Sequence, residues 1–212
     1  MSKRVKFLAF VLSVASVCLI FSACSITQEQ SETDSATDTE ITYENVDVDS
    51  YVKSIQYKDL SVTWNSATET KEDAVWNAVY ATVTIVEYPE DKVSYYFDQM
   101  KNTYMYYAKG DETDYKLLLE AQGISESDML EKAKETVKED LVFEYVIKHE
   151  GIVVTDAEKS SLFDKYVEKY SAELNKSPED VSANMKNYIY ESMLYDKTTE
   201  YLFSVNNIVP KQ

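Results

Sequence analysis

Few side chains in this sequence could take part in covalent or acid–base chemistry. The 212 residues include one histidine, His149, and two cysteines, Cys18 and Cys24. Both cysteines lie in an N-terminal segment that we expect to be removed or modified, so one histidine and no free thiol exclude the usual Cys-His and zinc-ligand arrangements. The sequence also lacks Gly-x-Ser-x-Gly, a phosphate-binding glycine loop and His-Glu-x-x-His. His149 is expected at the C-terminal end of a helix, where the dipole favours a solvated imidazolium. The sequence therefore predicts no enzyme, no metal site and no cofactor.

Cys24 ends an N-terminal segment that has the features of an export signal. The first six residues carry three positive charges, and residues 7–21 are apolar. This run of about 15 residues is shorter than the roughly 20 that a membrane-spanning helix needs. The sequence Phe21-Ser22-Ala23-Cys24 resembles a bacterial lipobox, whose cysteine takes a diacylglycerol and becomes the new N-terminus, although Phe21 replaces the usual Leu, Val or Ile. We expect a lipoprotein signal peptide over residues 1–23 and a lipidated Cys24. The alternative is an ordinary secretory signal with an incidental cysteine.

The charge of the chain excludes some partners and predicts a flexible tether. Acidic residues outnumber basic ones 38 to 21, and Arg4 is the single arginine. A nucleic-acid partner is excluded because phosphate binding needs a basic surface. Residues 24–50 are acidic, rich in Ser and Thr and free of lysine. Such a segment buries too little apolar surface to fold, so we expect a disordered acidic tether that holds the rest of the chain off a membrane.

The remaining residues predict a small mixed segment followed by a helical domain. Within residues 51–88, an alternating strand pattern precedes a short helix and a β-prone run. From residue 89 to 207, helix starts with Pro or a capping box and helix stops at Gly recur. The expected helices span 89–109, 114–122, 125–149, 155–174 and 177–205, and the first and last would be roughly 30 and 42 Å long. The fold class is therefore mainly α, with long arm helices after a small α/β segment.

Two of these helices carry apolar side chains on two faces. On the first helix, Tyr95 and Tyr106 lie opposite the predicted core stripe, and on the last helix a second face carries Tyr190, Leu194 and Tyr201. Tyrosine suits a peptide-binding surface because its large apolar ring has a polar tip. We expect these five residues to line a cleft that takes apolar segments of other proteins. The alternative is that both faces are core or a homodimer contact.

The order of these elements resembles the C-terminal chaperone domain of trigger factor, which is related in fold to the peptide-binding domain of the SurA and PrsA chaperones. The resemblance is carried by Tyr88-Pro89-Glu90-Asp91-Lys92-Val93, residues 115–138, residues 141–158 and the closing residues 201–209. Residues 56–63 also resemble the segment that leads into the family's prolyl isomerase domain. Only about 25 residues separate Thr63 from Pro89, too few for that domain. The resemblance implies a chaperone body without the isomerase and without the ribosome-binding domain.

These observations lead to two expectations about function. The first is an extracytoplasmic, lipid-anchored chaperone-like protein that reversibly binds apolar segments of unfolded exported proteins, without isomerase activity or nucleotide. Its partners would be unfolded clients and, through the lipid on Cys24, the membrane. The second is an adaptor lipoprotein that holds one specific folded envelope partner. The breadth of binding distinguishes the two, because a chaperone takes many unfolded segments and an adaptor takes one partner.

Overall fold

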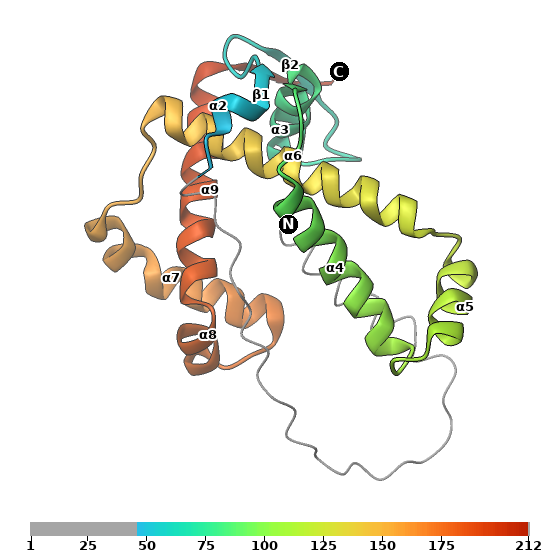
Figure 1. The fold of residues 1–212 in the computed structure, drawn as a ribbon. Helices are drawn as coiled ribbons and strands as arrows, with labels where there is room; N and C mark the ends of the chain where they lie inside the picture. Colours follow the sequence, from blue (N-terminus) through green and yellow to red (C-terminus); the bar gives the residue numbers. More distant parts are fainter. Residues whose placement is uncertain (1–45, 212) are drawn as a thin grey trace. The chain divides into compact units, whose positions relative to one another are not determined.

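A computed structural model describes residues 46–211 of the chain (Figure 1). The predicted signal peptide, Cys24 and residues 24–45 of the predicted tether lie outside the described residues. Helices dominate the described part, which confirms the mainly α fold class. The chain divides into two compact units. Unit 1 contains Glu87–Lys138, and unit 2 combines Asp47–Val86 with Glu139–Gln212.

Unit 1 consists of α4 (Glu90–Tyr107), α5 (Glu112–Gln122) and the helical residues 126–138 that follow. Two acidic residues in the first turn after Pro89 favour the start of α4. The chain then turns through Lys109 and Gly110, both with positive φ, into the N-cap Asp111. The helices α4 and α5 pack against each other. Tyr104 donates a hydrogen bond to the Gln122 side chain at 3.1 Å, which ties the end of α5 to α4.

The helix α6 (Glu126–Glu150) contributes its first half to unit 1 and its second half to unit 2. Its start is fixed by Ser125, whose backbone N–H donates to Asp128 at 2.7 Å, while the Asp128 N–H donates to the Ser125 hydroxyl at 3.2 Å. In unit 1, Glu126 pairs with Lys101 of α4 at 3.0 Å and accepts a hydrogen bond from Tyr115 of α5 at 3.0 Å. The three helices of unit 1 are thus joined at Glu126.

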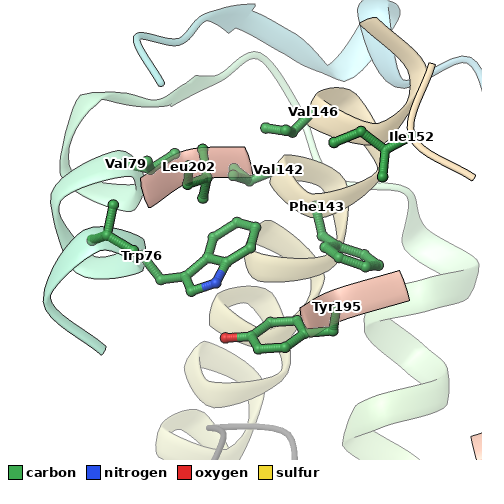
Figure 2. Close-up of a cluster of buried hydrophobic side chains, with 9 residues drawn as sticks. Trp76, Val79, Val142, Phe143, Val146, Ile152, Tyr195 and Leu202 are labelled. Carbon is green, nitrogen blue, oxygen red and sulfur yellow. The ribbon is translucent and has the colours of Figure 1, made fainter. Parts of the chain in front are cut away.

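The core of unit 2 is a cluster of aliphatic and aromatic side chains from α3 (Lys71–Thr82), α6 and α9 (Lys186–Val205) (Figure 2). At its centre the Trp76 ring stacks on Tyr80 at 5.5 Å and on Tyr195 at 5.3 Å between ring centroids. The Trp76 indole N–H donates to the Thr199 hydroxyl at 2.8 Å, so its polar atom is satisfied inside the core. The other buried members are Val75, Val79, Val142, Phe143, Val146, Ile152 and Leu202.

The strands of unit 2 form two separate two-stranded sheets. Strand β1 (Val52–Ser54), which follows the short helix α2 (Val48–Tyr51), pairs antiparallel with β3 (Thr84–Ile85). Strand β2 (Ser61–Trp64) pairs in parallel with β4 (Asn207–Pro210), with Val62 opposite Ile208. The sequence grouped residues 51–88 apart from residues 89–207. In the structure residues 47–86 belong to the same compact unit as residues 139–212, and α2 contacts β1.

The last predicted helix, 177–205, is wrong as a single element. The structure divides it into α8 (Pro178–Asn184) and α9, with Met185 out of helical geometry at φ −124° and ψ 18°. The preceding helix, α7 (Asp156–Leu174), ends at Asn175, whose left-handed conformation turns the chain into α8. Both α7 and α8 pack against α9 (Figure 1). Among residues 46–211, no helix has the length and apolar character that crossing a bilayer requires.

Candidate peptide-binding site

The N-terminal end of α7 is fixed to α9 by polar contacts. Thr155 and Glu158 form a capping box, in which each side chain satisfies a backbone N–H of the other residue. Lys197 of α9 donates to Glu158 at 2.6 Å and to the backbone oxygen of Val153 at 2.7 Å. The Lys197 ammonium and then the Thr155 N–H lower the pKa of Glu158 to about 2. Glu158 is therefore charged at neutral pH and holds α7 and α9 together.

Two further hydrogen bonds set the register between α7 and α9. The Tyr166 hydroxyl donates to Asp196 at 2.6 Å, and the Tyr170 hydroxyl donates to Ser192 at 2.9 Å. Burial, and then the hydrogen bond to Asp196, raise the pKa of Tyr166, so it stays neutral and keeps donating. The Tyr188 ring also meets Tyr170 edge to face at 5.1 Å. These contacts form a rigid frame, on which neighbouring side chains are held in defined positions.

An open pocket of about 450 Å³ lies on this frame, between α7, α8 and α9. Its aromatic wall consists of Phe163 from α7 and Tyr190 from α9, whose ring centroids are 5.8 Å apart. Ser182 of α8 lines it as well. Because α8 ends at Asn184 and α9 starts at Lys186, the break at Met185 lets both helices contribute to the pocket. A pocket of this size with aromatic walls can take a large apolar side chain.

Two lysines stand over the aromatic wall of the pocket. The Lys159 ammonium lies 5.0 Å from the centroid of the Tyr190 ring, and the Lys186 ammonium lies 5.8 Å from the same centroid. Both distances are within the range of a cation–π attraction. Asp164 also lines the pocket. The arrangement is suited to non-covalent binding of a group that combines apolar surface with a polar or charged part.

The structure separates the three residues that the sequence placed on one face of the last helix. Tyr190 is half-buried and lines the pocket. Leu194 and Tyr201 are partly buried and pack against the core of unit 2 instead. Tyr201 also donates a short hydrogen bond to Glu150 at the end of α6. The face is therefore packed at Leu194 and Tyr201 and open at Tyr190.

The two predicted tyrosines of α4 belong to unit 1. Tyr95 is half-buried and meets Tyr96 edge to face at 5.3 Å. Tyr106 is 78% exposed and meets Tyr107 in the same way at 5.5 Å. Leu117 of α5 is 57% exposed. Unit 1 thus carries apolar side chains in solvent, with Tyr106 the most open of the predicted residues.

Sequence reasoning missed Phe163, Lys159 and Lys186. One signal could have found them, because Lys159 precedes Phe163 by four residues and Lys186 precedes Tyr190 by four. Residues four apart lie on the same face of a helix, so each helix presents a lysine beside an aromatic ring. In residues 46–211, no group of three His, Cys, Asp or Glu side chains is placed to hold a metal ion.

Comparison with known proteins identifies the family. The sequence model described as "Bacterial trigger factor protein (TF) C-terminus" matches residues 63–204, about two thirds of the chain. The chain belongs to this family. The trigger factor C-terminus region runs from β2 to the end of α9, so it includes the helices that form the pocket. It starts well before Tyr88, where the main resemblance in the sequence begins, and it therefore takes in α3 and the core residue Trp76.

Curated relatives support the same family assignment. The chain is similar to the trigger factor of Caldicellulosiruptor saccharolyticus, with 23% identity over 148 residues, which is 66% of this chain and 33% of that protein. It is also similar to the trigger factor of Alkaliphilus oremlandii, with 27% identity over 142 residues, which is 65% of this chain and 33% of that protein. The chain thus spans about a third of the length of these trigger factors.

Proposed function

We propose that this chain is an extracytoplasmic, lipid-anchored chaperone-like protein that reversibly binds apolar segments of unfolded exported proteins. The observation that carries the proposal is the match to the trigger factor C-terminus over residues 63–204. Open apolar side chains support it in both units, at Tyr106 in unit 1 and at the Tyr190 pocket in unit 2. The sequence motifs of a nucleotide site are absent, so release would follow from weak, multi-site contacts. The proposed activity involves no isomerase chemistry.

Aggregation of unrelated unfolding proteins tests the chaperone activity. We expect the purified full chain, at near-stoichiometric amounts, to suppress light scattering from several clients. The double variant Tyr106→Ser with Tyr190→Ser should weaken suppression about 5- to 10-fold while the thermal unfolding midpoint stays nearly unchanged, because neither ring belongs to the core clusters and interface aromatics carry much of a binding energy.

Val153→Ser is the matched control, because Val153 is an exposed apolar residue outside the pocket and the side chain makes no polar contact. This variant should suppress aggregation as well as the parent chain. Failure of the parent chain to protect any client would contradict the proposal and favour an adaptor with one folded partner. A large fall in the unfolding midpoint of the double variant would instead mean that these tyrosines are needed for the fold.

The proposed lipid anchor needs a separate chemical test, because the structure does not describe Cys24. We expect intact mass spectrometry of the protein from bacterial membranes to find a chain that begins at Cys24 and carries acyl groups. Cys24→Ser should abolish this modification, and Cys18→Ser, within the apolar run, should leave it unchanged. A parent chain with an unmodified Cys24 would contradict lipid anchoring and leave a secreted protein. Two or more acyl chains would hold the protein stably, where one would hold it only marginally.

A further inference from the structure

The two lysines over Tyr190, Lys159 and Lys186, both line the pocket. Lys58, Lys148 and Lys197 each pair with a carboxylate at 2.8 Å or less. Among residues 46–211, the contacts of Lys159 and Lys186 are with the Tyr190 ring, and neither forms an ion pair. In a chain with 38 acidic and 21 basic residues, carboxylates are abundant. Two ammonium groups without an ion pair thus stand beside one pocket, whose lining contains a single carboxylate, that of Asp164.

The pocket combines this positive charge with an apolar wall. Phe163 and Tyr190 offer ring surface to an apolar side chain, and the two ammonium groups stand beside the same ring. Asp164 is the acidic residue among those that line the pocket, and it is exposed. The lysines can donate to a carboxylate that enters beside the rings, because each ammonium has three donors and no acceptor. A basic group entering there would meet two like charges.

We propose that the Tyr190 pocket selects client segments in which a large apolar side chain stands next to Asp or Glu. This inference rests on the proposed function, since it names the class of segment that the same chaperone would take at one of its sites. The apolar side chain would lie against Phe163 and Tyr190, and the neighbouring carboxylate would receive hydrogen bonds from Lys159 and Lys186. The rest of the acidic chain would repel such a segment, so the pocket is where charge complementarity favours it.

The expected selectivity is moderate and depends on salt. Exposed ion pairs are weak individually, and two of them change affinity by about 3- to 10-fold when an acidic residue replaces a neutral one. Salt screens such exposed pairs, so the preference should shrink between about 0.05 and 0.5 M NaCl. The apolar contact should persist over the same range, because it does not depend on charge. A residual affinity without charge preference is thus expected at high salt.

Fluorescence anisotropy with the full chain tests this inference. Three labelled unstructured peptides would share a central Phe-Leu pair and differ only in the flanking residue, which is Glu, Gln or Lys. We expect the Glu peptide to bind about 3- to 10-fold more tightly than the Gln peptide, and the Lys peptide to bind most weakly. The double variant Lys159→Gln with Lys186→Gln should bind the three peptides with nearly equal affinity.

Lys169→Gln is the matched control, because Lys169 also stands over tyrosine rings of α7, at 5.5 Å from Tyr166 and 5.3 Å from Tyr170, but does not line the pocket. It should keep the preference for Glu. Equal binding of the three peptides by the parent chain would overturn the inference and leave the proposed chaperone activity standing. A preference that survives in the double variant would also overturn it. Binding of none of the peptides, together with no suppression of aggregation, would contradict the proposed function itself.

Discussion

We expect Trp76→Ala to lower the free energy of unfolding by about 3 to 5 kcal/mol, the range for removing a large aromatic side chain from a packed core. Trp76 is 1% exposed and stacks between Tyr80 and Tyr195, with Phe143 at 6.0 Å between ring centroids. The substitution would leave a cavity among three helices. It would also remove the indole N–H that donates to the buried hydroxyl of Thr199.

Urea unfolding followed by circular dichroism at 222 nm measures this loss without relying on tryptophan fluorescence. Trp76→Phe is the matched variant, because it keeps an aromatic ring and should cost about 1 to 3 kcal/mol, including the unpaired Thr199 hydroxyl. It also provides a measurable value if Trp76→Ala does not fold. A loss below about 1 kcal/mol for Trp76→Ala would show that the packing of Trp76 on Tyr195 (Figure 2) does not form the stabilising core.

The starts of most helices could be predicted, because the side chains just before and within the first turn determine where a helix begins. The Thr155 and Glu158 capping box and the Ser177–Pro178 start are present as the sequence indicates. The break at Met185 could not be predicted in this way, because it contains no Pro or Gly and the apolar stripe runs through it. Ser182 and Asn184 are weak helix formers, so the packing of α8 on α7 and α9 can decide the local conformation there.

Prediction of the candidate site from the sequence was limited in a similar way. Helical periodicity placed Tyr190, Leu194 and Tyr201 on one face, but the angle around a helix does not say which element lies beside each turn. Tyr190, Ser192 and Asp196 of α9 contact α7, whereas Leu194 and Tyr201 pack against the core of unit 2. The pairing of β2 with β4 was missed for the same reason, since a strand pattern indicates a strand and does not name its partner.

A second large effect is expected at Glu150, the last residue of α6. Its carboxylate accepts hydrogen bonds from Tyr57, at 2.6 Å, and from Tyr201, and it pairs with Lys58 at 2.8 Å. The Glu150 side chain is 15% exposed. Lys58, then Tyr201 and Tyr57, lower the pKa of Glu150 to about 2. One carboxylate thus joins the β1–β2 connection, α6 and α9.

We expect Glu150→Gln to lower the free energy of unfolding at pH 7 by about 2 kcal/mol, the scale of hydrogen bonds to a charged group. Because the pKa of Glu150 is lower in the folded protein than its ordinary 4.5, its contribution is fully present above about pH 5. The contribution is lost as the pH falls from about 4.5 toward 2. The parent chain and the variant should therefore differ most at neutral pH and converge in acid, in urea titrations at several pH values.

Glu158→Gln is the matched control for this experiment. Glu158 also has a lysine partner and a pKa lowered to about 2, but its side chain is 38% exposed, so solvent screens the pair and the loss should be smaller. An equal loss in the two variants would contradict a special role for the Glu150 cluster. The result also bears on Tyr201, which the sequence assigned to client binding. If Tyr201→Phe destabilises the fold without weakening client binding, its hydroxyl serves the core of unit 2, and the open aromatic surface of α9 is confined to Tyr190.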